Sequence, residues 1–184
     1  MDIKFKHTDP AKEEKIYIEQ VFAEVPGGGM VSNPSFSAPA STAVGEDSNG
    51  KLQLIKAYKV VEAADSSATT IKIEKESGIA NGDVLATGKK GVACTAVDTT
   101  TSPDYDVVTI SMGVALNPGQ VLYQAKAAGT SVQPIYTPKY VLGNRVEANE
   151  GDAAVRLLNG ANLRKETAMV APELVEMMKS IALV

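Results

Sequence analysis

The segment Thr-Thr-Ile-Lys-Ile-Glu-Lys-Glu, residues 69–76, alternates apolar and charged side chains and carries the clearest structural signal in the chain. Successive side chains of a strand point to opposite faces, so Ile71 and Ile73 would face a core. Lys72 and Glu74 would then face solvent. The segment therefore predicts a half-buried β-strand.

Similar short runs, separated by Gly, Asp, Asn and Pro, recur from residue 51 onward at intervals of roughly 8–15 residues. We expect further strands at residues 52–62, 84–87, 92–97, 107–116, 121–124 and 136–142. Strands separated by turns favour a small β-barrel or sandwich over β-α-β units. The predicted fold class is mainly β, with an extended N-terminal arm and a short C-terminal helix.

Glycines mark specific backbone positions in this β-rich part of the chain. Gly113, inside the expected strand 107–116, would permit a bulge or the close approach of another group. The inward-facing residues of that strand would be Val108, Ile110, Met112 and Val114. Residues 78–86 and 116–124 echo each other, and each has a turn that closes on a glycine before Val-Leu. We expect Gly82 and Gly119 to adopt positive φ there.

The first 50 residues have a different composition. Residues 26–50 are rich in Gly, Pro, Ser and Thr, which predicts a linker or extended arm that orders only against a partner. Before them, residues 15–19 alternate like a strand, whereas Ile18, Val21, Phe22 and Val25 fit one helical face. We leave both structures open, with helix ahead. The predicted division is an N-terminal arm or linker at 1–50 and a β-rich domain with a C-terminal helix at 51–184.

The C-terminal residues predict a helix after a short strand. Residues 155–158, Val-Arg-Leu-Leu, are interpreted as a short strand, and Asn159-Gly160 is typical of a tight turn. Pro172 suits the first turn of a helix. The apolar stripe of that helix would be Leu174, Met177 or Met178, and Ile181. So short a helix must dock on something, either the β-rich domain or a neighbouring subunit, and the stripe is a candidate subunit-packing surface.

Composition excludes several classes of function. The 184 residues hold 18 Lys and Arg against 22 Asp and Glu, a net charge of −4 that disfavours nucleic-acid binding. Apolar runs are far shorter than the roughly 20 residues that cross a bilayer, and the first ten residues lack the apolar core of a secretory signal. One cysteine, Cys94, and one histidine, His7, supply neither an internal disulfide nor a Cys/His metal site. We expect no cofactor and no bound metal.

Three groups of residues are weak candidates for a site. Gly88-Lys89-Lys90-Gly91 resembles part of a phosphate loop but lacks the Ser or Thr after its lysine, so a hairpin turn is favoured. Cys94, in an apolar strand, is interpreted as a buried structural thiol rather than a nucleophile, and His7 as a solvent-exposed side chain. Two acidic groups are interpreted as solvated loops rather than cation or catalytic sites: Asp98, Asp104 and Asp106, and Glu147, Glu150 and Asp152.

Residues 151–167, followed by the Pro-started helix and the final Ile-Ala-Leu-Val, resemble tailed-phage head-decoration and head-fibre proteins. Residues 82–86 with 94–97 also resemble the β-rich part of that group, and the likeness covers about residues 51–184. The resemblance implies a non-enzymatic virion protein, made in the bacterial host cytoplasm from a phage or prophage gene. It implies binding to the outside of the major capsid protein lattice through an N-terminal arm, often as a trimer. It implies no catalytic residues.

Two other hypotheses remain. The first is a ligand-binding or adhesive β-domain, for instance one that binds carbohydrate. Its candidate contacts are Tyr105, Tyr123, Tyr136 and Tyr140. The second is a hydrolase that uses the acidic groups above, which ranks last because the sequence contains no paired base, nucleophile or metal set.

Overall fold

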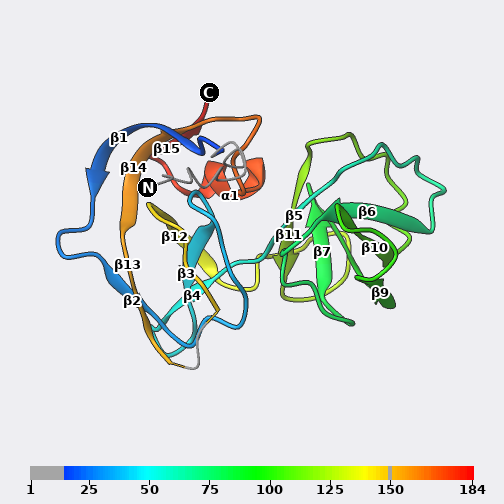
Figure 1. Ribbon diagram of the computed structural model, residues 1–184, viewed down its shortest axis with the longest axis horizontal. Coiled ribbons are helices and arrows are strands. Elements are labelled where there is room, and N and C mark those ends of the chain that lie inside the picture. Colours follow the sequence, from blue (N-terminus) through cyan, green and yellow to red (C-terminus); the bar gives the residue numbers. More distant parts are fainter. Residues whose placement is uncertain (1–14, 149–150) are drawn as a thin grey trace, which may run out of the picture.

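The computed structural model describes residues 15–148 and 151–184, which fold mainly as β-strands with one short helix near the C-terminus (Figure 1). The predicted mainly β fold class with one short C-terminal helix is confirmed. The strands form two lobes, an end lobe built from both ends of the chain and a middle lobe built from the residues between them (Figure 1).

The end lobe contains an eight-stranded sheet in the order β1-β14-β12-β3-β4-β2-β13, with β15 beside β14. Its elements are β1 (Ile18–Glu24), β2 (Gly29–Val31), β3 (Ala43–Glu46), β4 (Leu52–Leu54), β12 (Thr137–Leu142), β13 (Ala153–Val155), β14 (Leu157–Leu163), α1 (Pro172–Met177) and β15 (Ile181–Leu183). Strands from residues 18–54 thus pair with strands from residues 137–183, so neither end of the chain can form this sheet alone.

The middle lobe contains a four-stranded sheet, β5-β11-β7-β8, and a three-stranded sheet, β6-β10-β9. Its elements are β5 (Ala57–Lys59), β6 (Thr70–Glu74), β7 (Val84–Thr87), β8 (Lys90–Ala93), β9 (Ala96–Asp98), β10 (Tyr105–Thr109) and β11 (Val121–Ala125). As predicted, Ile71 and Ile73 are buried and pair with β10. The other predicted inward-facing residues join the same core: Val108, Ile110 and Met112 are buried, and Val114 packs against them.

The predicted turn geometry is also confirmed. Gly82 has φ +88° and Gly119 has φ +80°, values that favour glycine over any side chain. Each turn leads into a strand of the four-stranded sheet, where β7 and β11 are antiparallel neighbours. At the other end of β7, Gly88 and Lys89 form a two-residue hairpin turn, because Thr87 pairs with Lys90.

The N-terminal expectations need correction. Residues 18–24 form strand β1 instead of a helix. Residues 26–50 do not form a separate linker: they include β2 and β3, which pair with β13 and β12. Val31 and Val44 in these strands are fully buried. Residues 26–50 contain few apolar side chains, and they are nevertheless ordered because strands from the far end of the chain pair with them.

The C-terminal expectations need correction too. Asn159 and Gly160 lie inside β14 rather than in a turn, and a Cβ on Gly160 would lie 3.2 Å from the Cβ of Ala23 on β1. Gly160 therefore permits the close approach of β1. In the stripe proposed for subunit packing, Leu174, Met178 and Ile181 are buried in the chain's own core, and only Met177 is largely exposed.

The stripe is buried because α1 packs into a hydrophobic core to which both lobes contribute residues. This core combines Leu174 and Met178 with Ala86 and Tyr123 of the middle lobe. The Glu173 side chain accepts a hydrogen bond from the backbone N–H of Gly88. The lobes are thus packed together through α1. Within the described ranges, no helix has the length and apolar character needed to cross a membrane.

Candidate interaction surface

Strand β1 lies at one edge of the eight-stranded sheet and is the most exposed long strand of the end lobe (Figure 1). It pairs with β14, and among the described residues no strand pairs with its other edge. Six of its seven residues are exposed. An edge strand presents unpaired backbone N–H and C=O groups to solvent and is a template for another strand.

Apolar side chains at and just before this strand are exposed to solvent. Phe22 is 59% exposed and its neighbour Val21 is 37% exposed. The ladder with β14 is irregular between Val21 and Ala23, so simple alternation does not place Val21 and Phe22 on opposite faces. Six consecutive exposed residues show instead that neither face of β1 is fully covered by the described residues. Ile16, just before the strand, is 53% exposed. We name Ile16, Val21, Phe22 and the free edge of β1 the β1 surface.

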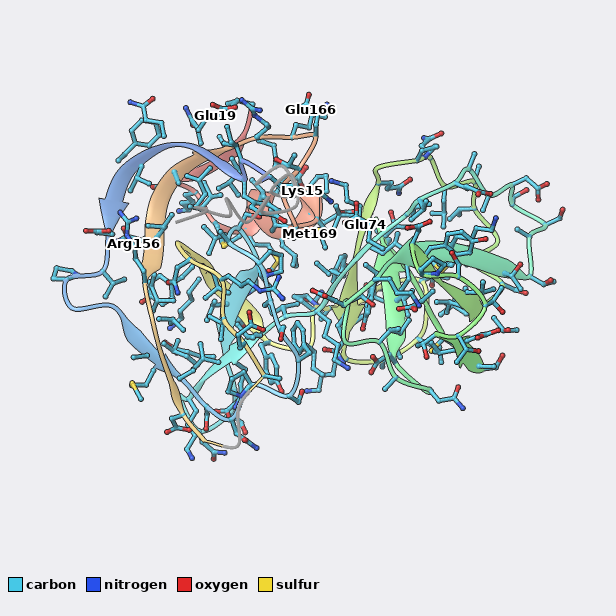
Figure 2. The ribbon with its side chains drawn as sticks, viewed as in Figure 1. Lys15, Glu19, Glu74, Arg156, Glu166 and Met169 are labelled. Carbon is cyan, nitrogen blue, oxygen red and sulfur yellow. The ribbon has the colours of Figure 1, made fainter. Side chains whose placement is uncertain are left out.

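Ion pairs fix β1 to the sheet without burying it. Arg156 contacts Glu24 at 2.6 Å, and Arg164 forms a second ion pair with Glu19. The backbone N–H of Arg164 donates to the carbonyl of Tyr17 at 3.0 Å. Figure 2 shows Glu19 and Arg156 on the outer side of the end lobe. The two glutamates of β1 are thus neutralised by neighbours, which lowers the electrostatic cost of bringing another chain to this edge.

A cleft of about 1030 Å³ lies between the lobes, with Met169 among its lining residues. Two ion pairs connect its walls: Lys15 with Glu74 at 3.3 Å, and Arg145 with Glu76 at 3.0 Å. Figure 2 shows Lys15, Glu74 and Met169 at the junction of the lobes. Because these charges are paired with one another, they are better suited to holding the lobes together than to acid–base chemistry. The partners are 59 and 69 residues apart, a separation that no local sequence pattern reveals.

The first acidic group is divided among different local contacts. Asp106 is buried and pairs with Lys75 at 2.7 Å. Asp98 accepts hydrogen bonds from Thr100 and Thr101 in its own loop. Asp104 is exposed at the rim of the cleft. Two of the three carboxylates therefore stabilise their own loops and strands.

The Asp98 loop gives a test in acid. Hydrogen bonds from the Thr101 and Thr100 side chains and the Thr100 backbone hold the pKa of Asp98 well below its ordinary value of 3.8. A carboxyl whose pKa is lowered by folding adds stability above the unfolded value and loses it as pH falls through the folded value. We expect an NMR titration to place the Asp98 midpoint below 3.8. A midpoint at or above that value would show that the loop does not hold the ionised carboxylate.

The second acidic group is also engaged locally. Glu147 accepts hydrogen bonds from Arg145 at 2.5 Å and from Ser37 at 2.6 Å, and both contacts lower its pKa, that of Arg145 more. Asp152 accepts from the Ser32 hydroxyl at 2.9 Å. Glu150 and His7 lie outside the described residues. Across residues 15–148 and 151–184, no three His, Cys, Asp or Glu side chains gather to hold a metal ion.

The candidate tyrosines and the cysteine do not form one binding face. Tyr123 is buried in the shared core, and Lys72 lies over the Tyr105 ring at 4.6 Å from its centroid. Tyr136 is half-buried against the shared core, and Tyr140 against a separate core of the end lobe. Cys94 is buried with its thiol donating to the carbonyl of Ala80, as expected of a structural thiol.

No protein-family model, curated protein or solved structure gives a significant match to this chain. The physical case for a function thus rests on the described residues, among which the β1 surface is the most exposed apolar feature. Val21 and Phe22 fitted one face of a helix in the sequence, whereas Ile16 belonged to the strand-like alternation at residues 15–19. The alternation at residues 15–19 was the local signal for a strand, but it gave no indication that both faces would be exposed.

Proposed function

We propose that the chain is a non-enzymatic structural protein of a phage virion that decorates, or projects from, the outside of the capsid. Its partner is the major capsid protein lattice, and it is made in the bacterial host cytoplasm before it joins the virion. The observation that carries the proposal is the β1 surface, a solvent-exposed edge strand that carries exposed apolar residues. The resemblance of residues 51–184 to head-decoration and head-fibre proteins supports the same function.

In this proposal an extended segment of the capsid protein adds to the free edge of β1. Main-chain hydrogen bonds supply affinity in such strand addition, while Phe22 and Val21 supply apolar contacts. The protein acts as a closed homotrimer, the assembly that the resemblance to head-decoration proteins implies and one of the closed symmetries that homo-oligomers adopt. Met177, the exposed member of the C-terminal stripe, remains available for a subunit contact.

The experiment is to mix the full chain with purified capsids of the encoding phage that lack it, and to sediment the mixture. We expect the chain to sediment with the capsids in a saturable amount. Light scattering of the free protein is expected to give three times the chain mass of 19.3 kDa. A chain that stays in the supernatant at micromolar concentration would contradict the proposed function, and a monomer mass at all concentrations would contradict the trimer.

A further inference from the structure

A small open pocket of about 400 Å³ lies in the middle lobe, at the hairpin turn between β7 and β8. It is lined by Thr87, Gly88, Lys89, Lys90, Val114, Ala115, Gln120 and Thr130. We name it the Lys90 pocket. It includes three residues of the Gly88–Gly91 segment that resembles part of a phosphate loop, and the proposed function makes no use of it.

The ammonium group of Lys90 has a defined place beside this pocket. A Cβ built on Gly113 would lie only 2.3 Å from Lys90 Nζ, so Lys90 can occupy this position because residue 113 has no side chain. Gly113 also has φ +64°, a conformation that disfavours other residues. The sequence prediction of a close approach at Gly113 is confirmed, and the approaching group is an ammonium.

The two lysines at the pocket form no ion pair with the other described residues. Among the residues that the structure describes, no carboxylate forms an ion pair with Lys89 or Lys90. Gln120 is held in place, because its amide donates to Thr87 Oγ1 at 2.9 Å and its Oε1 accepts from the Asn117 N–H at 3.1 Å. A fixed amide beside two unpaired ammonium groups is suited to an oxygen ligand that carries negative charge.

One acidic side chain lies close by. Glu173 accepts hydrogen bonds from the Gly88 N–H and from Thr87 Oγ1, the latter at 3.4 Å. Its charge is held by the backbone of the turn and does not form an ion pair with either lysine. The two lysines and Glu173 together carry a net charge of +1.

We infer that the Lys90 pocket binds a small oxyanion, a single carboxylate or phosphate group, with Lys90 as the main contact and Lys89 and Gln120 beside it. A volume of about 400 Å³ leaves room for one such group together with water. The inference goes beyond the proposed function and does not depend on capsid binding.

The test is a titration of the full chain with inorganic phosphate and, separately, with acetate, followed by amide NMR at low salt. We expect saturable shifts at Gly88, Gly91 and Gly113, with a Kd of the order of 1–10 mM. Saturation by both anions would identify a general carboxylate and phosphate site, and saturation by phosphate alone a phosphate site. Either result supports the inference.

Lys90→Gln is expected to weaken binding at least about tenfold, because it removes a charge-assisted hydrogen bond. Lys165→Gln, at an exposed lysine of the end lobe, is the matched control and should leave the Kd unchanged. If Lys90→Gln disturbs the fold, Lys89→Gln provides the same test with a loss of about threefold. Shifts that rise without saturation up to about 100 mM anion, where salt screens exposed charges, would overturn the inference. Equal affinity in the wild type and in both pocket variants would also overturn it.

Discussion

A chain that begins at Lys51 is expected to lose the cooperative fold of the end lobe. The truncation removes β1, β2 and β3, so β12 and β13 each lose a partner strand and β4 loses both of its neighbours. It also removes Val31 and Val44, both fully buried. These two side chains alone represent about 3–6 kcal/mol of burial, against a total stability of about 5–15 kcal/mol for a typical domain.

Thermal unfolding followed by circular dichroism measures this effect. We expect the truncated chain to show no cooperative transition for the end lobe. A chain that begins at Val25 is the matched control, because it loses only the exposed strand β1 and the residues before it, and it should still unfold cooperatively at a lower midpoint. A sharp transition near the full-length midpoint in the chain from Lys51 would show that residues 15–50 are an independent arm after all.

The second large effect is expected at Asp83, which holds together one end of the four-stranded sheet. Its carboxylate accepts hydrogen bonds from Lys56 Nζ at 2.8 Å, Tyr58 OH at 3.1 Å, the Ala80 N–H at 2.9 Å and Gln124 Nε2 at 3.2 Å. The Lys56 and Asp83 side chains are only 13% and 12% exposed. Burial first, and then the charge of Asp83, raise the pKa of Tyr58, so this hydroxyl stays a donor throughout the accessible pH range.

Asp83→Ala leaves the Lys56 ammonium and the Tyr58 hydroxyl without their acceptor. Removing one partner of a buried pair costs about 3–5 kcal/mol, and we expect a loss of this size in urea unfolding. Asp65→Ala is the control, because Asp65 is exposed and accepts only within its own turn, and it should cost at most about 1 kcal/mol. Equal losses of unfolding free energy in Asp83→Ala and Asp65→Ala would show that Asp83 contributes no more to stability than an exposed turn residue.

The sequence predicted the strand at residues 70–74 and the turns of the middle lobe because those signals are local, although the strand expected at residues 107–116 ends at Thr109. The alternation at Ile71 and Ile73 depends on neighbouring residues, and the turns at Gly82 and Gly119 depend on the backbone freedom of one residue each. The close approach at Gly113 was also foreseen, although the sequence did not indicate that the approaching group would be Lys90.

The end lobe could not be predicted in the same way because its pairings are distant in sequence. Residues 26–50 are poor in apolar side chains, and β2 and β3 are stable because β13 and β12, about a hundred residues later, pair with them. The spacing of Val21 and Phe22 fitted a helical face by chance. Strand β1 is exposed along nearly its whole length, so it does not need the strict alternation of apolar and polar residues that marks a half-buried strand. Leu174 and Met178 appeared available for a partner because no local pattern indicates that the middle lobe covers them.

The same distance in sequence hid the candidate surface. Strand β1 is an edge strand because it pairs with β14 on one side and no described strand pairs with it on the other side. The contacts that fix this edge, Arg156 with Glu24 and Arg164 with Glu19, join residues more than 130 positions apart. Only the three-dimensional fold brings these side chains together.

The most direct test of the central claim is capsid binding by a variant of the β1 surface. Phe22→Glu places a charge on the exposed edge, and Met30→Glu is the matched control on β2, since both side chains are more than half exposed. Neither change should shift the free energy of unfolding by more than about 0.5 kcal/mol. In a sedimentation assay with capsids that lack the protein, Phe22→Glu is expected to bind at least about tenfold more weakly than Met30→Glu. Binding by Phe22→Glu that equals the wild type would contradict attachment through β1.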